Sequence, residues 1–265
     1  MQDAMFSGLF GALTTEHRMN FIANNLANVN TTGYKQDRLA FKDTMAFYAH
    51  DEIREPLATV RSKPLFPEPK NMSRARIAVS KTDYSQGSFH FTGDALDVAI
   101  GGENAFFRVR TPRGDFLTRD GHFVLNGEGV LMTPQGYPVQ GVGGEIVIPP
   151  GTRNVGIGEN GQVTADNEPV NVISLVSVGN PQNLEKMGHN LYRPRANVQV
   201  AEGDAYIESR ARLEQGFIET ANVEVVTEMV NMIEVHRQFE AYQKVMQTAD
   251  SLDRDANQKV GRRQG

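Results

Sequence analysis

The chain has 265 residues, of which 39% are hydrophobic, and it contains no cysteine. The length permits one or two domains, and the lack of cysteine excludes both a disulfide framework and thiolate ligation of a metal. A net charge of −5 argues against a general nucleic-acid role, and no stretch approaches the roughly 20 apolar residues that cross a bilayer.

The first predicted element is a helix from residue 4 to about residue 30. Apolar side chains recur there at spacings of three and four, which places them on one face of a helix. This stripe is interrupted near Thr15 and Glu16, and Gly33 suits the positive φ of a residue that ends a helix. Residues 1–6 lack the basic lead and the sustained apolar core of a secretory signal, so no cleaved signal peptide is expected.

Four asparagines gather toward the end of this helix, although asparagine is a poor helix former. Capping and fraying toward Gly33 account for Asn28 and Asn30. Asn24 and Asn25 lie earlier, among apolar residues, and two interpretations stay open for them. They belong either to the same frayed end or to a buried contact that sets the register between packed helices, as buried Asn does in coiled coils.

Residues 34–83 show no clean hydrophobic period and are predicted to form an extended linker. Four prolines between residues 56 and 69 keep the later part of this segment extended. Residues 54–81 carry seven basic and two acidic side chains, a net charge of +5, which leaves −10 on the rest of the chain. We interpret this basic stretch either as a solvated linker or as a docking strip for an acidic neighbour.

Residues 84–215 are predicted to form a central antiparallel β domain. Short apolar or alternating runs are separated by turn signals such as Asp120-Gly121 and Asn126-Gly127, whose glycines supply positive φ angles. The run 156–161 matches G-x-G-x-x-G, but the segment after it has the composition of a strand. Dinucleotide binding needs a helix at that point, so a tight β-turn is the favoured interpretation.

Residues 222 to about 256 are predicted to form a second helix. They contain no Gly or Pro and repeat apolar side chains every three or four positions. A helix of about 35 residues is about 50 Å long. Because a compact β domain cannot cover a face of that length, the natural partner of this helix is the N-terminal one.

Patterns of catalytic and metal-binding residues are absent from the sequence. None of the six histidines forms an H-x-x-x-H or H-E-x-x-H pair, and no G-x-S-x-G motif occurs. Several carboxylates lie in turn-like contexts where they bond to local backbone, namely Asp94, Asp97, Asp115, Asp120 and Asp166. We therefore predict no enzyme activity, no cofactor, no metal site and no small-molecule substrate.

These elements predict an α+β fold in which the two terminal helices pair as a coiled-coil-like axial domain. The predicted domains are an N-terminal axial helix at 1–33, an extended linker at 34–83, a central β domain at 84–215 and a C-terminal axial helix at 216–265. Such a helical hairpin leaves apolar surface exposed, which favours assembly. The predicted assembly interface comprises Met5, Leu9, Ala12, Met19, Ile22, Asn25, Leu26, Val29, Val225, Met229, Met232, Ile233, Val235, Phe239, Tyr242 and Met246.

Residues 23–35 read ANNLANVNTTGYK, which resembles the N-terminal signature of the flagellar rod, hook and hook-associated axial proteins. The further matching segments are 97–100 with 106–107, 118–123 with 136–139, and 228–234 with 248–250. The matches lie at both ends and in the middle of the chain, in the order that the family has them.

The resemblance implies a structural subunit of the bacterial flagellar basal-body rod, which transmits torque across the periplasm. It also implies export through the flagellar type III apparatus without signal cleavage, and assembly with other copies of the chain and with neighbouring rod proteins. Residues 92–97, 144–150 and 184–188 are most similar to proximal-rod members, and a distal-rod or hook subunit is the alternative. The alternative from another class is a periplasmic adaptor, in which a helical hairpin also flanks a β domain.

Overall fold

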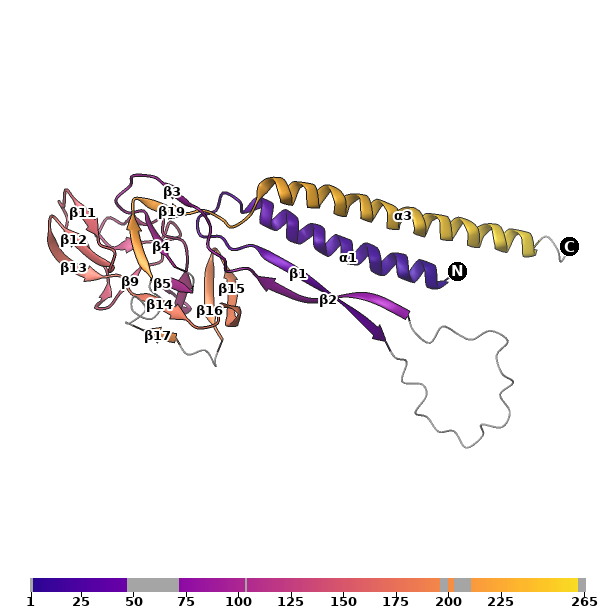
Figure 1. The fold of residues 1–265 in the computed structure, drawn as a ribbon, viewed down its shortest axis with the longest axis horizontal. Coiled ribbons are helices and arrows are strands. Elements are labelled where there is room, and N and C mark those ends of the chain that lie inside the picture. The colour runs from indigo at the N-terminus through magenta and orange to yellow at the C-terminus, as the bar shows by residue number, and fades with distance from the viewer. Residues whose placement is uncertain (1, 47–71, 103, 196–199, 203–210, 262–265) are drawn as a thin grey trace, which may run out of the picture. The chain divides into compact units, whose positions relative to one another are not determined.

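The computed structural model describes residues 2–46, 72–102, 104–195, 200–202 and 211–261. These residues form two compact units. The helical unit contains the described residues within 1–23, 38–81 and 229–265, and the β unit contains those within 24–37 and 82–228. Each terminal helix contributes residues to both units, since α1 spans Gln2–Ala27 and α3 spans Val225–Gly261 (Figure 1).

In the helical unit, α1 and α3 contact one another around two glycines of α1 (Figure 1). A methyl group added at Gly8 would lie 3.1 Å from the side chain of Met246, and one added at Gly11 would clash with the ring of Tyr242. Glycine therefore permits the close approach of the two helices at this point. Because the later residue on α1 faces the earlier residue on α3, the helices run antiparallel.

The helix boundaries agree with the predicted ranges 4–30 and 222–256 to within a few residues, because neither helix contains proline. The prediction that Gly33 ends the first helix is wrong, since α1 ends at Ala27. Gly33 lies in the following loop with a φ of 65°. A methyl group there would lie 2.6 Å from the backbone nitrogen of Asp120, so this glycine allows two backbones to meet.

The segment predicted as an extended linker instead contains two paired strands, and this corrects the prediction. β1 spans Asp37–Ala46, β2 spans Met72–Thr82, and the two pair into a two-stranded sheet. Basic and apolar residues alternate over residues 74–77 of β2, as the period of a strand requires, but the prolines between 56 and 69 obscured this short pattern. Residues 54–71 of the basic stretch lie outside the described residues, so both interpretations of that stretch stay predictions.

The predicted central antiparallel β region is confirmed, and its largest element is a six-stranded sheet in the order β15-β16-β6-β5-β14-β17. Its strands are β5 (Ala105–Thr111), β6 (Gly114–Thr118), β14 (Leu175–Val178), β15 (Leu184–Gly188), β16 (Leu191–Pro194) and β17 (Val200–Glu202). The smaller sheets are built from β3 (Phe89–Phe91) with β19 (Phe217–Glu219), β4 (Val98–Gly101) with β18 (Arg212–Gln215), β7 (Val124–Leu125) with β8 (Leu131–Met132), β9 (Gln140–Gly141) with β10 (Gly144–Glu145), and β12 (Gln162–Ala165) with β11 (Val155–Ile157) and β13 (Glu168–Val172). A 3-10 turn, η2 (Pro181–Asn183), precedes β15.

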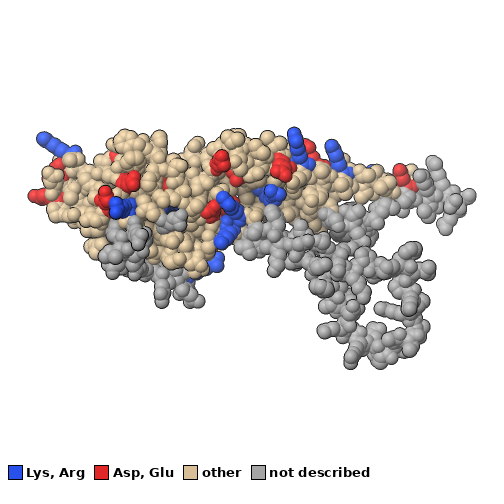
Figure 2. All heavy atoms as spheres, viewed as in Figure 1, with Lys and Arg blue, Asp and Glu red and all other residues tan. Residues whose placement is uncertain are grey.

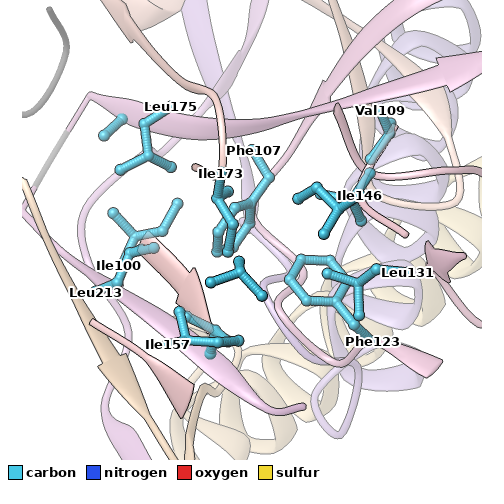
Figure 3. Close-up of a cluster of buried hydrophobic side chains, with 14 of the residues drawn as sticks. Ile100, Phe107, Val109, Phe123, Leu131, Ile146, Ile157, Ile173, Leu175 and Leu213 are labelled. Carbon is cyan, nitrogen blue, oxygen red and sulfur yellow. The ribbon is translucent and has the colours of Figure 1, made fainter. Parts of the chain in front are cut away.

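The core of the β unit consists of a large cluster of buried apolar side chains (Figure 3) and a smaller one. Successive side chains of a strand point to opposite faces, so Phe107 enters this cluster while Phe106 joins Tyr192 in a second, smaller one. The rings of Phe107 and Phe123 meet edge to face with their centroids 5.0 Å apart. The six-stranded sheet is therefore packed on both faces.

Two glycine-containing segments test the predicted turns. The run 156–161 turns β11 into β12, with the Gly161 nitrogen donating to the Gly158 carbonyl at 2.8 Å, and a strand follows it. The tight-turn interpretation of the G-x-G-x-x-G match is thus confirmed. Gly121, predicted to supply a positive φ, instead permits a close approach, because a methyl group there would clash with the Val98 carbonyl.

Replacing Phe107 with Ala should lower the free energy of unfolding of the β unit by about 3–5 kcal/mol, because loss of a fully buried ring leaves a cavity. Urea unfolding of the full chain, followed by circular dichroism, measures the change. Phe91→Ala is the matched control, since that ring is 66% exposed and its loss should cost less than about 1 kcal/mol. Equal losses in the two variants would contradict the placement of Phe107 in the core.

Candidate functional site

The less exposed faces of the two helices follow one repeating pattern. On α1 the buried residues are Gly8, Ala12, Thr15, Ile22 and Asn25. On α3 the buried or partly buried residues include Val225, Glu228, Met232, Val235, Phe239, Met246 and Ala249. Alternate spacings of three and four are those of helices that pack along their length.

Thr15 continues the buried stripe of α1, so the prediction of an interruption at this residue is wrong. Its hydroxyl donates to the carbonyls of Gly11 at 2.9 Å and Ala12 at 2.8 Å, and the polar group is therefore satisfied within the helix. Glu16, the other residue of the predicted interruption, is exposed. A threonine in an apolar stripe can thus be a packing residue, which a pattern of apolar letters alone does not show.

The structure divides the predicted interface residues into three groups. The buried ones are Ala12, Ile22, Asn25 and Val235. The partly buried ones are Met19, Leu26, Val29, Val225, Met232, Phe239 and Met246. The exposed ones are Leu9, Met229, Ile233 and Tyr242. The side chain of Met5 lies outside the described residues.

Apolar side chains also lie on exposed positions of both helices. Leu9 and Leu13 are exposed on α1. On α3, four exposed apolar residues follow one another within two turns, and we call them the α3 stripe: Val226, Met229, Val230 and Ile233. Figure 2 shows that uncharged atoms cover much of the visible surface along the described helices. Within the described residues, neither helix is long and apolar enough to cross a membrane.

The loop after α1 is folded tightly onto the β unit by its own polar side chains. Asn25 is 3% exposed, and its amide oxygen accepts from the Asp37 nitrogen and the Tyr34 hydroxyl, both at 3.1 Å. Its amide nitrogen donates to the Asp37 carbonyl at 3.0 Å. These bonds join the end of α1 to the start of β1. They favour a third role for Asn25, bracing a chain reversal, over the two interpretations drawn from the sequence.

Three charged residues from distant parts of the chain meet inside the β unit, and we call them the buried triad: Lys35, Arg119 and Glu219. The Glu219 carboxylate accepts from the Lys35 ammonium and from the Arg119 guanidinium, each at 2.6 Å. All three side chains are at most 2% exposed. Arg119 also donates to three backbone carbonyls, those of Ala105, Ile100 and Gly102.

Backbone groups complete the surroundings of Glu219. The Gly87 nitrogen donates to its carboxylate at 2.9 Å, and the Gly33 nitrogen donates to its carbonyl at 2.8 Å. Burial alone raises the pKa of Glu219, but the charges of Arg119 and Lys35 outweigh burial and hold the pKa below its usual value. The carboxylate is therefore ionised at neutral pH and ties the loop after α1 to β19, the last strand before α3.

Sequence reasoning missed the buried triad, although Lys35 and Arg119 both lie in segments that carried the family resemblance. The usual expectation for a lysine or arginine is a solvated position, and the partners lie 100 and 184 residues apart along the chain. The available signal was an isolated charge beside apolar runs, as at Glu219 after Phe217 and Ile218. No group of three or more His, Cys, Asp or Glu side chains suited to a metal occurs in the part of the chain that the structure describes.

Comparison with known proteins gives matches to three family models. Residues 11–35 match the model described as flagella basal body rod protein. Residues 99–165 match the D1 domain of the flagellar hook protein FlgE/F/G, and residues 214–259 match the C-terminal region of the flagellar basal body rod FlgEFG proteins. Each member of the buried triad falls in a different one of these segments.

Curated relatives match the chain over almost its whole length. The flagellar basal-body rod protein FlgG of Buchnera aphidicola (subspecies Schizaphis graminum) is 35% identical over 88% of this chain and 90% of its own. FlgF of Caulobacter vibrioides is 33% identical over 99% of both chains. FlgG of Bacillus subtilis is 31% identical over 95% of this chain and 97% of its own.

Replacing Glu219 with Gln should lower the free energy of unfolding by about 3–5 kcal/mol at pH 7, because Lys35 and Arg119 are then buried without a countercharge. The sign of the pH effect follows from the lowered pKa. Glu219 stabilises the fold above its usual pKa of 4.5, and this contribution is lost as the pH falls through the lower folded value. Urea unfolding at a series of pH values measures both effects.

Glu159→Gln is the control for this substitution, since the ion pair of Glu159 with Arg212 spans 3.6 Å and both side chains are about three-quarters exposed. It should change the free energy of unfolding by less than about 0.5 kcal/mol. If Glu219→Gln and Glu159→Gln unfold at the same urea concentration, the triad does not stabilise the β unit.

Proposed function

The chain belongs to the family of flagellar basal-body rod proteins, and from this premise we propose that it builds part of the proximal rod by polymerising through its terminal helices. Proteins of this family are structural, so the chain is a structural rod subunit and not an enzyme. Relatives matched over nearly their whole length are rod proteins, and the periplasmic adaptor alternative therefore has no support.

The assignment to the proximal rod rests on length and on local likeness. The Caulobacter protein FlgF is aligned over 99% of both chains, whereas a second FlgF relative aligns over 96% of both and the FlgG relatives align over 88–97%. Residues 92–97, 144–150 and 184–188 favour the same subtype. The identity of 35% to one FlgG makes a distal-rod subunit the second candidate.

The observation that carries the polymerisation model is the apolar surface left on the helices. α1 and α3 contact one another around Gly8 and Gly11, but the α3 stripe of Val226, Met229, Val230 and Ile233 stays 49–70% exposed. Contiguous exposed apolar side chains mark sites of protein association. We propose that neighbouring subunits cover this stripe and the exposed leucines of α1, Leu9 and Leu13. The coiled-coil-like axial domain forms in that assembly.

The same proposal includes the export route of the subunit and its location in the cell. The chain is exported by the flagellar type III apparatus without signal cleavage and joins the rod within the periplasm. Membership of the flagellar rod family supports this route, because the relatives are subunits of the basal body.

Deleting this chain should abolish swimming and leave basal bodies with shortened rods, because subunits that assemble after it lose their attachment. Electron microscopy of purified basal bodies measures the length of the remaining rod. Truncation near the inner-membrane end would assign the chain to the proximal rod, and truncation further out would assign it to the distal rod. Complete rods and normal swimming would contradict a rod role.

Ile233→Asp should lower incorporation of the chain into basal bodies roughly tenfold or more, because an unpaired charge would be buried in the contact. Immunoblotting of purified basal bodies measures incorporation, and circular dichroism of the purified chain reports its fold. Thr227→Asp adds the same charge at an exposed position outside the α3 stripe and should incorporate normally. Equal incorporation of the two variants would overturn the proposed role of the stripe.

A further inference from the structure

A polar pocket lies in the β unit beside the turn that joins β15 to β16. Its volume is about 420 Å³, which is far more than a bare ion needs and is enough for a long side chain with its flanking backbone. The lining residues come from the end of α1, from the loop after it and from two turns: Asn24, Asn28, Thr31, Tyr34, Asp37, Asp120, Gln135, Lys186 and 188–191. The buried triad does not line it.

The walls of this pocket are held by a strained hairpin turn. His189 and Asn190 have φ values of 51° and 56°, a left-handed conformation that is unfavourable for residues other than glycine. The turn places the Asn190 amide where it donates to the Thr32 carbonyl at 2.7 Å. The strained turn thus fixes the pocket wall to the loop after α1.

Asp120 brings a carboxylate to this pocket with one oxygen unused. The residue is 6% exposed, and its Oδ1 accepts from the Thr32 hydroxyl at 2.6 Å and from the His122 nitrogen at 3.1 Å. Among the described residues no hydrogen bond reaches Oδ2. Burial raises the pKa of Asp120, as expected for a carboxylate with too few partners.

The other charges lining the pocket are already matched. Lys186 donates to Asp37 at 2.9 Å and lies 4.7 Å from the centre of the Tyr34 ring. The formal charge left over is the one on Asp120. A buried carboxylate with an open acceptor position is stabilised by a cation that also donates hydrogen bonds, which an ammonium or a guanidinium does.

The chain presents such a cation at the opposite end of the same sheet. Strand β6 begins at Gly114 and ends at Thr118, and Thr118 pairs with Leu191, so the pocket lies beyond the end of β6. Arg113 lies in the turn before β6 and is exposed. At about 3.3 Å per residue, about 20 Å of extended chain separates Gly114 from Asp120.

The tip of the β5–β6 hairpin carries an excess of positive charge. Arg108 and Arg110 share one carboxylate, that of Asp115, at 2.9 Å and 3.1 Å. Arg113 makes no ion pair with any described residue. The hairpin tip and the pocket are thus complementary in charge and lie at opposite ends of one rigid sheet.

We propose that the pocket binds the Arg113 side chain of a second copy of this chain, so that the Asp120 carboxylate receives its guanidinium. The contact joins two different surfaces, and a contact of that type repeats from copy to copy without closing unless rotation makes a ring. It rests on the proposed function, because it requires copies of the chain to meet in an assembled rod. It adds a contact between β units to the contacts of the helices.

The charge of the pocket can be measured in the unassembled chain. The chain has no cysteine, so Gln135→Cys places a single thiol on the pocket wall. Its rate of reaction is compared for a cationic methanethiosulfonate, which carries a trimethylammonium group, and an anionic one, which carries a sulfonate. Adding Asp120→Asn should lower the cation-to-anion rate ratio on the order of fivefold, because a nearby charge in a partly buried site is removed.

Glu159→Gln combined with Gln135→Cys is the control, since Glu159 is exposed and does not line the pocket. This change should leave the rate ratio unaltered. An unchanged ratio in the Asp120→Asn variant would overturn the proposal, because the pocket would then have no attraction for a cation.

The identity of the occupant is tested by cross-linking in basal bodies. A chain carrying both Pro112→Cys and Gln135→Cys, which keeps Arg113, should give a ladder of products larger than dimers when it is treated with a short bismaleimide. Arg153→Cys with Gln135→Cys is the control, because Arg153 is exposed on a different turn, and it should give no ladder.

The outcomes distinguish a failure of the proposed contact between copies from a failure of the proposed rod function. Incorporation of the chain with Pro112→Cys and Gln135→Cys into basal bodies without a ladder would overturn the contact between copies and leave the rod role intact. A pocket that attracts cations but gives no ladder would likewise overturn that contact and assign the site to a free cation such as a polyamine. A chain that never enters basal bodies, even without substitutions, would overturn both the contact and the proposed function.

Discussion

The architecture of the β unit depends on one carboxylate. Glu219 holds the loop after α1 through Lys35 and Gly33, and it holds the end of β6 through Arg119. Burying three charges carries a large desolvation penalty, and their mutual attraction offsets it only when the geometry is close and every donor has an acceptor. Here Arg119 and Lys35 also donate to backbone carbonyls. The loop after α1, the end of β6 and strand β19 are consequently joined to one another within the β unit.

How much of this fold the sequence predicts depends on how far apart along the chain the interacting residues lie. The two helices and the turn at 156–161 are local features with a period or a spacing, and all three were predictable. The pairing of β1 with β2 was missed because its signal is divided by 25 residues rich in proline. The role of Asn25 was also missed, since its partners at Tyr34 and Asp37 lie beyond the end of the helix. Lys35 and Glu219 form a contact across 184 positions, for which no periodicity exists.

In the proposed assembly, the same helix contacts both its own chain and neighbouring subunits. The inner residues of α3, such as Val235 and Ala249, are buried within the chain, whereas Val230 and Ile233 face outward. The hydrophobic effect does not distinguish a partner in the same chain from one in a neighbour, so the outer residues are available to the assembly. In the proposed assembly, the pocket at Asp120 would add a polar and directional contact to this apolar association, because hydrogen bonds constrain the orientation of a contact more than apolar burial does.

The seam between the two units does not coincide with the ends of the helices. The last turn of α1, from Asn24 onward, and the first turn of α3, up to Glu228, belong to the β unit. Asn25 and Lys35 are the reason on the N-terminal side, since their partners are all in that unit. Hybrid chains that exchange the helices of two rod proteins should therefore be spliced after Ala23 and before Met229. A splice at the loop after Ala27 would transplant Asn25 with the foreign helix and separate it from the backbone that it braces.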